Sequence, residues 1–196
     1  GKLAYAAGFG VASLDERRPV TPRTLFHMAS VTKPFVATAV MQLVEEGRVA
    51  LDAPVVEYVP YFTLRDGRAG ELSVRQLLSH TSAMPDVDDY GWDRPEYDEG
   101  ALERYVRGLH TQALLGEPGA SYAYSNMAYE VLGDLVAKVS GQSFEAQVQE
   151  RILTPLGMAD STLLVREADP ALLSRGHVIG ADGNLRVSAV FPYHRA

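Results

Sequence analysis

The sequence predicts an α+β fold, and three observations support that prediction. Short segments with the composition of β-strands lie near both ends of the 196-residue chain, and stretches with helical periodicity fill its middle. No repeat, low-complexity tract or linker separates the two kinds of segment. We therefore expect residues 1–196 to form a single domain. Its antiparallel sheet would be built from the two ends of the chain, flanked by helices and interrupted by an inserted helical lobe.

The first strand is expected over residues 3–13, which are mostly small and apolar, and the chain is expected to turn at residues 15–19. Gly8 and Gly10 lie within this strand. Because no third glycine and no helix follow them, they favour close packing against a neighbouring strand over a dinucleotide-binding loop.

A long buried helix is expected next. Residues 35–44 form an apolar run that ends in two glutamates and Gly47, a pattern typical of a buried helix with a glycine stop. Pro34 is tolerated only in the first turn of a helix, because the missing N–H is not needed there. The helix must therefore begin close to Ser30.

The remaining segments alternate between helices and turns. Serine caps are expected at Ser73 and Ser143, and a glycine stop at Gly141. The expected elements are a short turn at residues 55–58, an exposed turn at 65–68, helices at 74–79, 102–109, 127–139 and 144–153, and a hairpin within 177–196 that turns at 182–184.

Composition excludes several classes of protein. A net charge of −7 argues against binding to nucleic acid or to anionic membrane surfaces. No apolar run reaches the roughly 18 residues that span a bilayer. No signal peptide opens the sequence, although Gly1 looks like a trimmed start. Without cysteine, disulfide bonds and thiolate zinc sites are excluded.

Ser30 and Lys33 are the first candidate catalytic residues. They are three residues apart, so one helical turn brings the hydroxyl and the amine to the same face. A serine at a helix N-terminus also lies among unpaired backbone N–H groups, which stabilise a developing oxyanion. These are the parts of an acyl-transfer nucleophile. The alternative is a capping serine beside a solvated lysine, but the chain has only three lysines and apolar residues surround Lys33.

Residues 85–99 are acidic, aromatic and irregular. A segment of this kind is usually a solvated loop, but it can also form a lid that lends an aromatic side chain to a pocket. On the second interpretation, Tyr90 and Trp92 are candidate substrate-binding residues.

The histidines give no evidence for a Ser-His-Asp triad. His27, His80 and His110 are scattered along the chain, and the Gly-x-Ser-x-Gly turn of such hydrolases is missing. A His-Glu-x-x-His pair is missing as well, so no metal site is expected. His80, at the end of the helix predicted over 74–79, is expected to form structural hydrogen bonds.

Four stretches resemble the penicillin-recognising serine hydrolases, in particular the class C β-lactamases, D-peptidases and β-lactamase-like esterases. Residues 26–33 are similar to the family's first motif, Ser-x-x-Lys, and residues 124–126 to its second motif, Tyr-x-Asn. Residues 77–85 resemble the family's Leu-Leu-x-His-Thr-Ser-Gly-x-Pro, with Ala83 in place of the glycine. Residues 155–158 match its Pro-Leu-Gly-Met turn. The resemblance covers nearly the whole chain.

The resemblance implies roles for four residues. Ser30 would be the nucleophile and Lys33 its partner, while Tyr124 would act as base and as proton donor to the leaving group. Asn126 would bond both Lys33 and a substrate carbonyl. On the residues alone, either Tyr124 or a neutral Lys33 can take the proton of Ser30. No metal ion or cofactor is implied.

The family's third motif, Lys-Thr-Gly or His-x-Gly on a late strand, is missing from the sequence, because His177-Val178-Ile179-Gly180 has a different spacing. In the family that strand supplies a second oxyanion N–H, whose loss typically costs about 10²–10³ in rate. The resemblance therefore implies a domain that is truncated at both ends relative to the family. A second chain or segment would complete its sheet.

The expected function is hydrolysis of esters, of amides of D-amino-acid peptides or of β-lactams through an acyl-serine intermediate. An esterase or D-peptidase is favoured over a true β-lactamase, and the substrate is expected to be a small molecule or a peptide. The alternative is a catalytically silent binding or regulatory module with the same fold.

Overall fold

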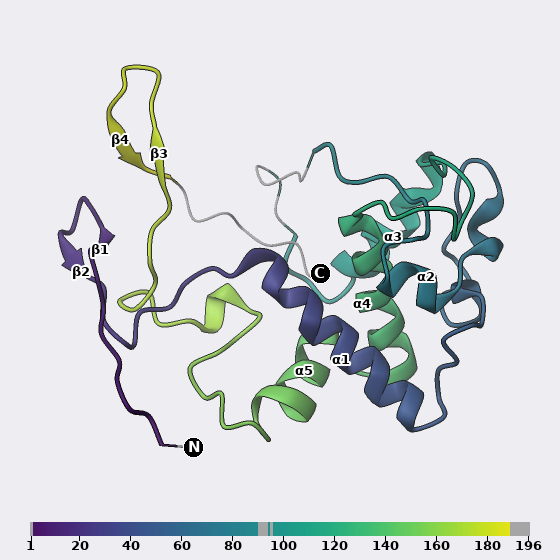
Figure 1. Cartoon of the computed structure of the whole chain (residues 1–196), viewed down its shortest axis with the longest axis horizontal. Coiled ribbons are helices and arrows are strands. Elements are labelled where there is room, and N and C mark those ends of the chain that lie inside the picture. The colour runs from purple at the N-terminus through teal and green to yellow at the C-terminus, as the bar shows by residue number, and fades with distance from the viewer. Residues whose placement is uncertain (1, 90–93, 95, 189–196) are drawn as a thin grey trace.

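The computed structural model describes residues 2–89, 94 and 96–188 (Figure 1). Two long helices, α1 (Thr32–Glu45) and α4 (Asn126–Ser140), pack against each other. The helical part also contains α2 (Val74–Leu78), α3 (Ala101–Gly108) and α5 (Phe144–Val148). Two small β-hairpins lie on one side of it (Figure 1). The predicted α+β class is confirmed.

Short helical turns connect these elements. They are η1 (Ala29–Val31), η2 (Val55–Glu57), η3 (Arg68–Glu71), η4 (Leu109–Thr111) and η6 (Val165–Glu167). The helix expected over 144–153 ends in η5 (Gln149–Leu153), a π-helical turn. There the N–H of Thr154 bonds the carbonyl of Gln149 at 2.9 Å, five residues back, which is the π-helical pattern.

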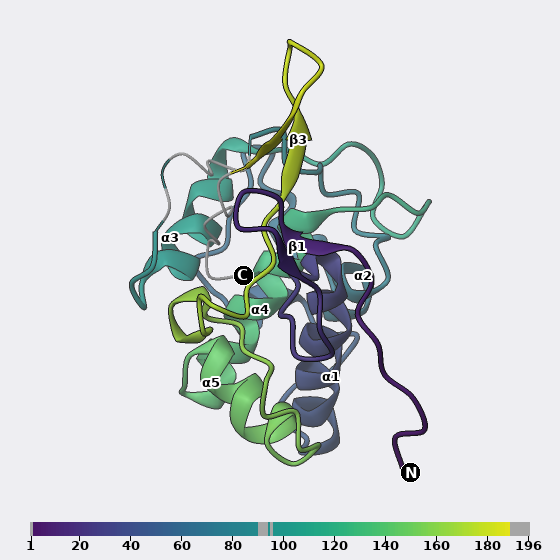
Figure 2. The same cartoon turned by 90° about the vertical axis from the view of Figure 1, so that its left-hand side faces the viewer.

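The strands form two separate antiparallel hairpins. One pairs β1 (Val11–Ser13) with β2 (Arg18–Pro19), and the other pairs β3 (His177–Ile179) with β4 (Leu185–Val187). Figure 2 shows the two hairpins beside each other, and the N–H of Arg175 bonds the carbonyl of Ala12 at 2.7 Å. The two ends of the chain therefore meet as predicted, but in the described residues they do not form one sheet.

The strand expected over residues 3–13 is shorter than predicted. Only Val11–Ser13 is paired, and residues 2–9 have no regular structure. A strand exists only where a neighbour accepts its ladder of hydrogen bonds. Within the part of the chain that the structure describes, no strand lies in place to pair with residues 2–9.

Helix α1 begins where the sequence places it. Ser30 lies in η1, α1 follows at once, and Pro34 falls in its first turn. The buried side chains recur every three or four residues and are Val36, Ala39, Val40 and Leu43. Gly47, with a φ of 70°, then turns the chain away in a conformation that glycine adopts without strain.

Helix α4 is fixed at both ends, by a serine cap that was not among the expected ones and by the expected glycine stop. The side chain of Ser125 caps its N-terminus and accepts a 3.1 Å hydrogen bond from the N–H of Ala128. Gly141, with a φ of 78°, ends it. A capped start matters here because Tyr124 and Asn126 flank the cap, so their positions follow from where the helix begins.

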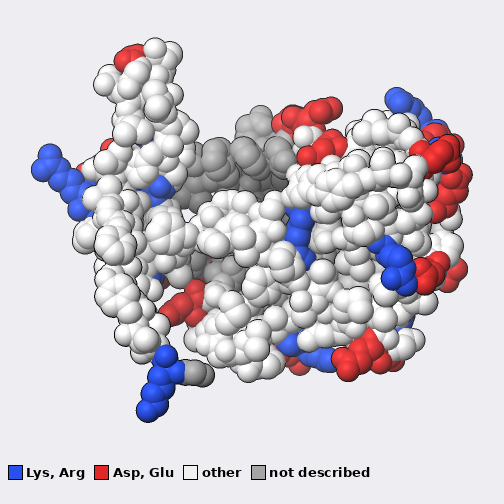
Figure 3. Space-filling model, in the orientation of Figure 1, with Lys and Arg blue, Asp and Glu red and all other residues white. Residues whose placement is uncertain are grey.

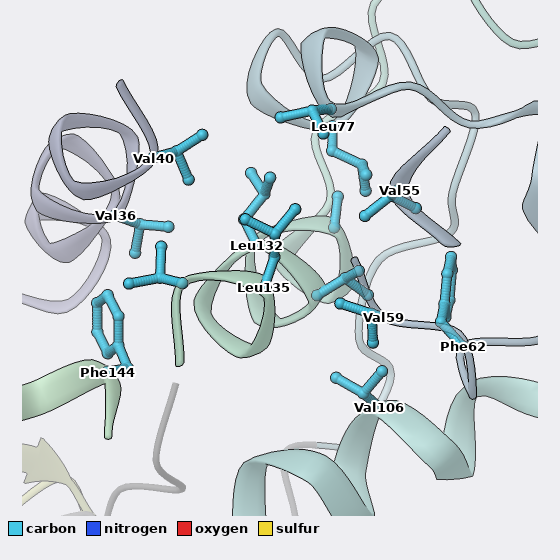
Figure 4. Packing of buried hydrophobic residues seen from close by; sticks show 14 of the residues in the cluster. Val36, Val40, Val55, Val59, Phe62, Leu77, Val106, Leu132, Leu135 and Phe144 are labelled. Carbon is cyan, nitrogen blue, oxygen red and sulfur yellow. The ribbon is translucent and has the colours of Figure 1, made fainter. Parts of the chain in front are cut away.

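The core lies where α1 and α4 meet and extends toward the shorter helices (Figure 4). Its side chains are fully or almost fully buried. Those labelled in Figure 4 are Val36, Val40, Val55, Val59, Phe62, Leu77, Val106, Leu132, Leu135 and Phe144. This packing fixes α1 relative to α4, and the N-terminal turns of both helices carry the polar residues described next.

Among residues 2–89, 94 and 96–188, no helix has both the length and the apolar character that crossing a membrane requires.

Candidate active site

Ser30 is presented at the surface by η1, and its side chain is exposed. The residue before it, Ala29, has a φ of 43°, a left-handed conformation that non-glycine residues seldom adopt. Strain of this kind persists only where the surrounding structure enforces it, and it occurs often at active sites.

Lys33 lies one turn further along, in α1, and is half-buried. Its Nζ donates to Ser30 Oγ at 3.3 Å and to Asn126 Oδ1 at 2.5 Å. The same nitrogen lies 4.8 Å from the ring centre of Tyr124 and 5.5 Å from that of Tyr129, within the range of cation–π attraction. The structure thus brings together the hydroxyl and the amine that the sequence paired by spacing.

Tyr124 reaches Ser30 from a distant part of the chain, 94 residues on. The Tyr124 hydroxyl lies 2.8 Å from Ser30 Oγ, and it donates to Asn126 Oδ1 at 3.3 Å. Within the described residues, Ser30 Oγ is therefore in contact with both Tyr124 and Lys33. All four residues to which the resemblance gave roles lie in this one hydrogen-bonded cluster.

A carboxyl group is buried close to the cluster. Glu130 follows Asn126 by one turn of α4, and its Oε2 is buried with no hydrogen-bond partner among the described residues. Burial raises the pKa of Glu130 to about 8, and the positive charge of Lys33 offsets part of the rise. The uncharged form of this carboxyl is therefore favoured at neutral pH.

His80 supports the segment that carries Tyr124. Its Nδ1 accepts a 3.2 Å hydrogen bond from the N–H of Ser125, and its ring centre lies 4.5 Å from that of Tyr124 and 4.9 Å from that of Tyr129. Burial lowers the pKa of His80, and the charge of Lys33 lowers it further, against a smaller opposite effect of Asp86. These are the contacts of a structural hydrogen bonder, as the sequence predicted.

Replacing His80 with asparagine is expected to weaken the dependence of stability on pH. Because the pKa of His80 is lower in the folded protein, neutral His80 contributes its full stability above the unfolded pKa of about 6.5. This stability is lost as pH falls through the folded pKa. Asparagine tolerates the φ of 56° at this position and keeps an acceptor for Ser125. Urea unfolding of both proteins, well above and below pH 6.5, should show a smaller loss of unfolding free energy in the variant. An equal loss would contradict this.

The other sequence candidates do not add to the cluster. His110 Nδ1 lies 2.8 Å from the carbonyl oxygen of Arg107, at the end of α3. His27 lines the cavity described next, where burial lowers its pKa. Tyr90 and Trp92 fall outside the described residues, so a lid that contains them stays a prediction.

An apolar cavity of about 490 Å³ lies beside η1, between the start of α1, helix α5 and residues 158–174. Ala29 and Val31 line it, but Ser30 between them does not. The cavity therefore flanks the turn that carries the hydroxyl without including the hydroxyl itself.

Asp86 contacts the cluster and was missed by sequence reasoning. Its Oδ1 accepts hydrogen bonds from the backbone N–H of Asn126 at 2.8 Å and from its side-chain Nδ2 at 2.9 Å. In the sequence, Asp86 lies in the acidic segment 85–99, for which a solvated loop or a lid is expected. Its position directly after the stretch 77–85 was the one available signal.

Known proteins are similar to this chain in both sequence and fold. The family model described as Beta-lactamase matches residues 1–193. Esterase EstB of Burkholderia gladioli is 36% identical over 181 residues, which cover 86% of this chain and 46% of EstB.

Two solved structures extend the comparison. The octameric penicillin-binding protein homologue from Pyrococcus abyssi superposes with a TM-score of 0.83 at 32% identity, over 98% of this chain and 45% of that one. The D-amino acid amidase from Ochrobactrum anthropi gives 0.72 at 28% identity, over 95% and 51%. The chain thus spans about half the length of these relatives.

The superpositions confirm the predicted β-lactamase/transpeptidase-like fold. The match to the family model over almost the whole sequence agrees with the resemblance seen in the four stretches. The chain belongs to the beta-lactamase family.

Proposed function

We propose that the protein is a serine hydrolase that cleaves ester or amide bonds through an acyl-serine intermediate on Ser30. The observation that carries the proposal is the contact of one exposed hydroxyl with two proton-handling groups, Tyr124 at 2.8 Å and Lys33 at 3.3 Å. A serine hydroxyl is a weak nucleophile until a neighbouring base takes its proton. The cluster supplies that base.

In the proposed acylation step, Ser30 Oγ attacks the carbonyl carbon of the substrate while the phenolate form of Tyr124 takes the hydroxyl proton along their hydrogen bond. Tyr124 then gives this proton to the departing alcohol or amine, which leaves the acyl group on Ser30. A water molecule then loses a proton to Tyr124 and attacks the acyl carbon, and Tyr124 returns this proton to Ser30 Oγ as the acid leaves. Lys33, when charged, stabilises the Tyr124 phenolate; the alternative is that a neutral Lys33 takes the proton itself.

Small esters and amides of D-amino acids are proposed as substrates ahead of β-lactams. The names of two relatives, an esterase and a D-amino acid amidase, support this order. A penicillin-binding protein homologue also matches, which keeps β-lactams as the third class to test. The alternative function, a silent binding module, would bind such molecules without forming a bond to Ser30.

We also propose that residues 1–196 act as one domain whose small hairpins are extended by further strands, from the same protein or from a second chain. Charged side chains are sparse over the middle of the face in Figure 3. Large apolar side chains near the first hairpin and η1 are exposed, namely Leu3, Tyr5, Phe9, Phe26, Met28 and Val31. Exposed apolar surface of this kind marks a contact surface.

The test of the catalytic proposal is covalent labelling. The protein is incubated separately with a fluorophosphonate, an activated ester and a fluorescent penicillin, and each sample is analysed by intact mass and by peptide mapping. One adduct per chain, mapped to Ser30, supports the proposal, and whether the ester or the penicillin also acylates Ser30 begins to separate ester from lactam chemistry. Unmodified protein with all three reagents, or an adduct at other residues only, would favour the silent module.

A further inference from the structure

The start of α4 is held by a short loop, residues 80–86, through hydrogen bonds to consecutive residues. Besides the bond between Ser125 and His80 already described, Ser125 Oγ donates to the carbonyl of Pro85 at 2.7 Å. The N–H of Asn126 donates to the carboxylate of Asp86 at 2.8 Å. The loop therefore fixes the backbone from which Tyr124 and Asn126 project.

The side-chain amide of Asn126 lies between a cation and an anion. Its Oδ1 accepts from Lys33 at 2.5 Å and from Tyr124 at 3.3 Å, while its Nδ2 donates to Asp86 at 2.9 Å. The two ends of an amide differ only in being acceptor or donor, and the torsion that exchanges them is broad and roughly two-fold. The hydrogen-bonding groups around Asn126 therefore decide which way its side-chain amide is oriented.

Asp86 favours the orientation that the cluster needs. An ionised carboxylate only accepts hydrogen bonds, so it selects the NH₂ end of Asn126 and directs the oxygen to Lys33. The opposite orientation would set an NH₂ group against the Lys33 ammonium and the Tyr124 hydroxyl. Lys33 would then lose the acceptor that holds it 3.3 Å from Ser30.

We infer that Asp86 is a positioning residue of this site: it sets the side-chain amide of Asn126, and through it the place of Lys33 beside Ser30. Carboxylate, amide and ammonium form a chain of hydrogen bonds in which each link strengthens the next. The inference deepens the proposed function and rests on it for its kinetic consequence. The orientation of the amide can also be measured without any reaction.

A purely structural role for Asp86 is the competing explanation. Asp86 also accepts from the backbone N–H of Asn126, in the first turn of α4, where a negative charge stabilises the helix. That contribution does not involve the Asn126 side chain. It would therefore persist when Asn126 is replaced by alanine, and this difference separates the two roles.

The kinetic experiment measures the rate constant for fluorophosphonate labelling of Ser30 in five variants, including Asn126→Ala as the reference for the double variant. Asp86→Ala is expected to lower it about tenfold, and Asp86→Asn, which keeps an acceptor oxygen, to stay within about threefold. In an Asn126→Ala background, Asp86→Ala should add less than about a twofold change. Asp88→Ala, which removes an exposed carboxylate from the same segment, is the charge control and should leave the rate unchanged.

The same tenfold loss in the Asn126→Ala background, or no loss in Asp86→Ala, would overturn the inference. A second measurement tests the positioning role of Asp86 independently of the proposed function. In ¹⁵N-edited NMR spectra, one Asn126 Nδ2 proton should be shifted downfield and protected from exchange in the native protein and in Asp86→Asn. It should lose both features in Asp86→Ala. An unaltered Asn126 signal in Asp86→Ala would refute the positioning role, even if Ser30 reacts with no reagent.

Discussion

Replacing Ser30 with alanine is expected to abolish the covalent adduct with fluorophosphonates and activated esters. The hydroxyl is the atom group that forms the bond, and both Tyr124 and Lys33 contact it. Because the Ser30 side chain is exposed, its removal leaves no buried cavity, so the melting temperature should be unchanged. Intact mass after incubation, together with a thermal melt, measures both effects.

The matched control is Ser121→Ala, which removes another exposed hydroxyl close to Tyr124 in the sequence. It should label at the native rate. An adduct of undiminished yield in the Ser30 variant would mean that a different residue is the nucleophile, and the proposed role of the whole cluster would be wrong.

Replacing Tyr124 with phenylalanine is expected to slow the acylation of Ser30 by about a hundredfold or more, the effect typical of losing a positioned general base. The substitution removes the hydroxyl that lies 2.8 Å from Ser30 Oγ. It leaves the aromatic ring in place against His80, at 4.5 Å between ring centres, so the fold should be retained. The time course of adduct formation with an activated ester measures the change.

Tyr122→Phe is the control for the second prediction, because Tyr122 is exposed and its ring also lies near His80, at 5.7 Å. It should acylate at the native rate. If Tyr124→Phe does so as well, the proton of Ser30 goes to Lys33, and the alternative form of the mechanism is the correct one.

The helical elements were predictable because their signals are local. The buried spacing of α1, the serine caps at Ser73 and Ser143 and the glycine at Gly141 act within one or two turns of chain. The strands were less predictable, since residues 2–9 have the composition of a strand but no neighbour to pair with in the described structure. Strand formation depends on a partner that local sequence does not specify.

The site residues show the same difference between local and non-local signals. The pairing of Ser30 with Lys33 follows from one helical turn, whereas the meeting of Ser30 with Tyr124 depends on the docking of two helices and came from the resemblance alone. Neither helical spacing nor the resemblance identified Asp86. Its contact with Asn126 spans 40 residues, and its position directly after the stretch 77–85 is the one feature that distinguishes this carboxylate from its acidic neighbours.

The separation of Ser30 and Tyr124 by 94 residues also makes the hydroxyl a reporter of folding. A chain with α1 and α4 formed but not yet docked would hold a nucleophile without its proton acceptor, and it would react slowly. Non-local contacts of this kind form late, because closing the loop between them costs entropy. Pulse labelling with a fast covalent probe during refolding would therefore measure when α1 and α4 dock, because the labelling rate of Ser30 rises at that point.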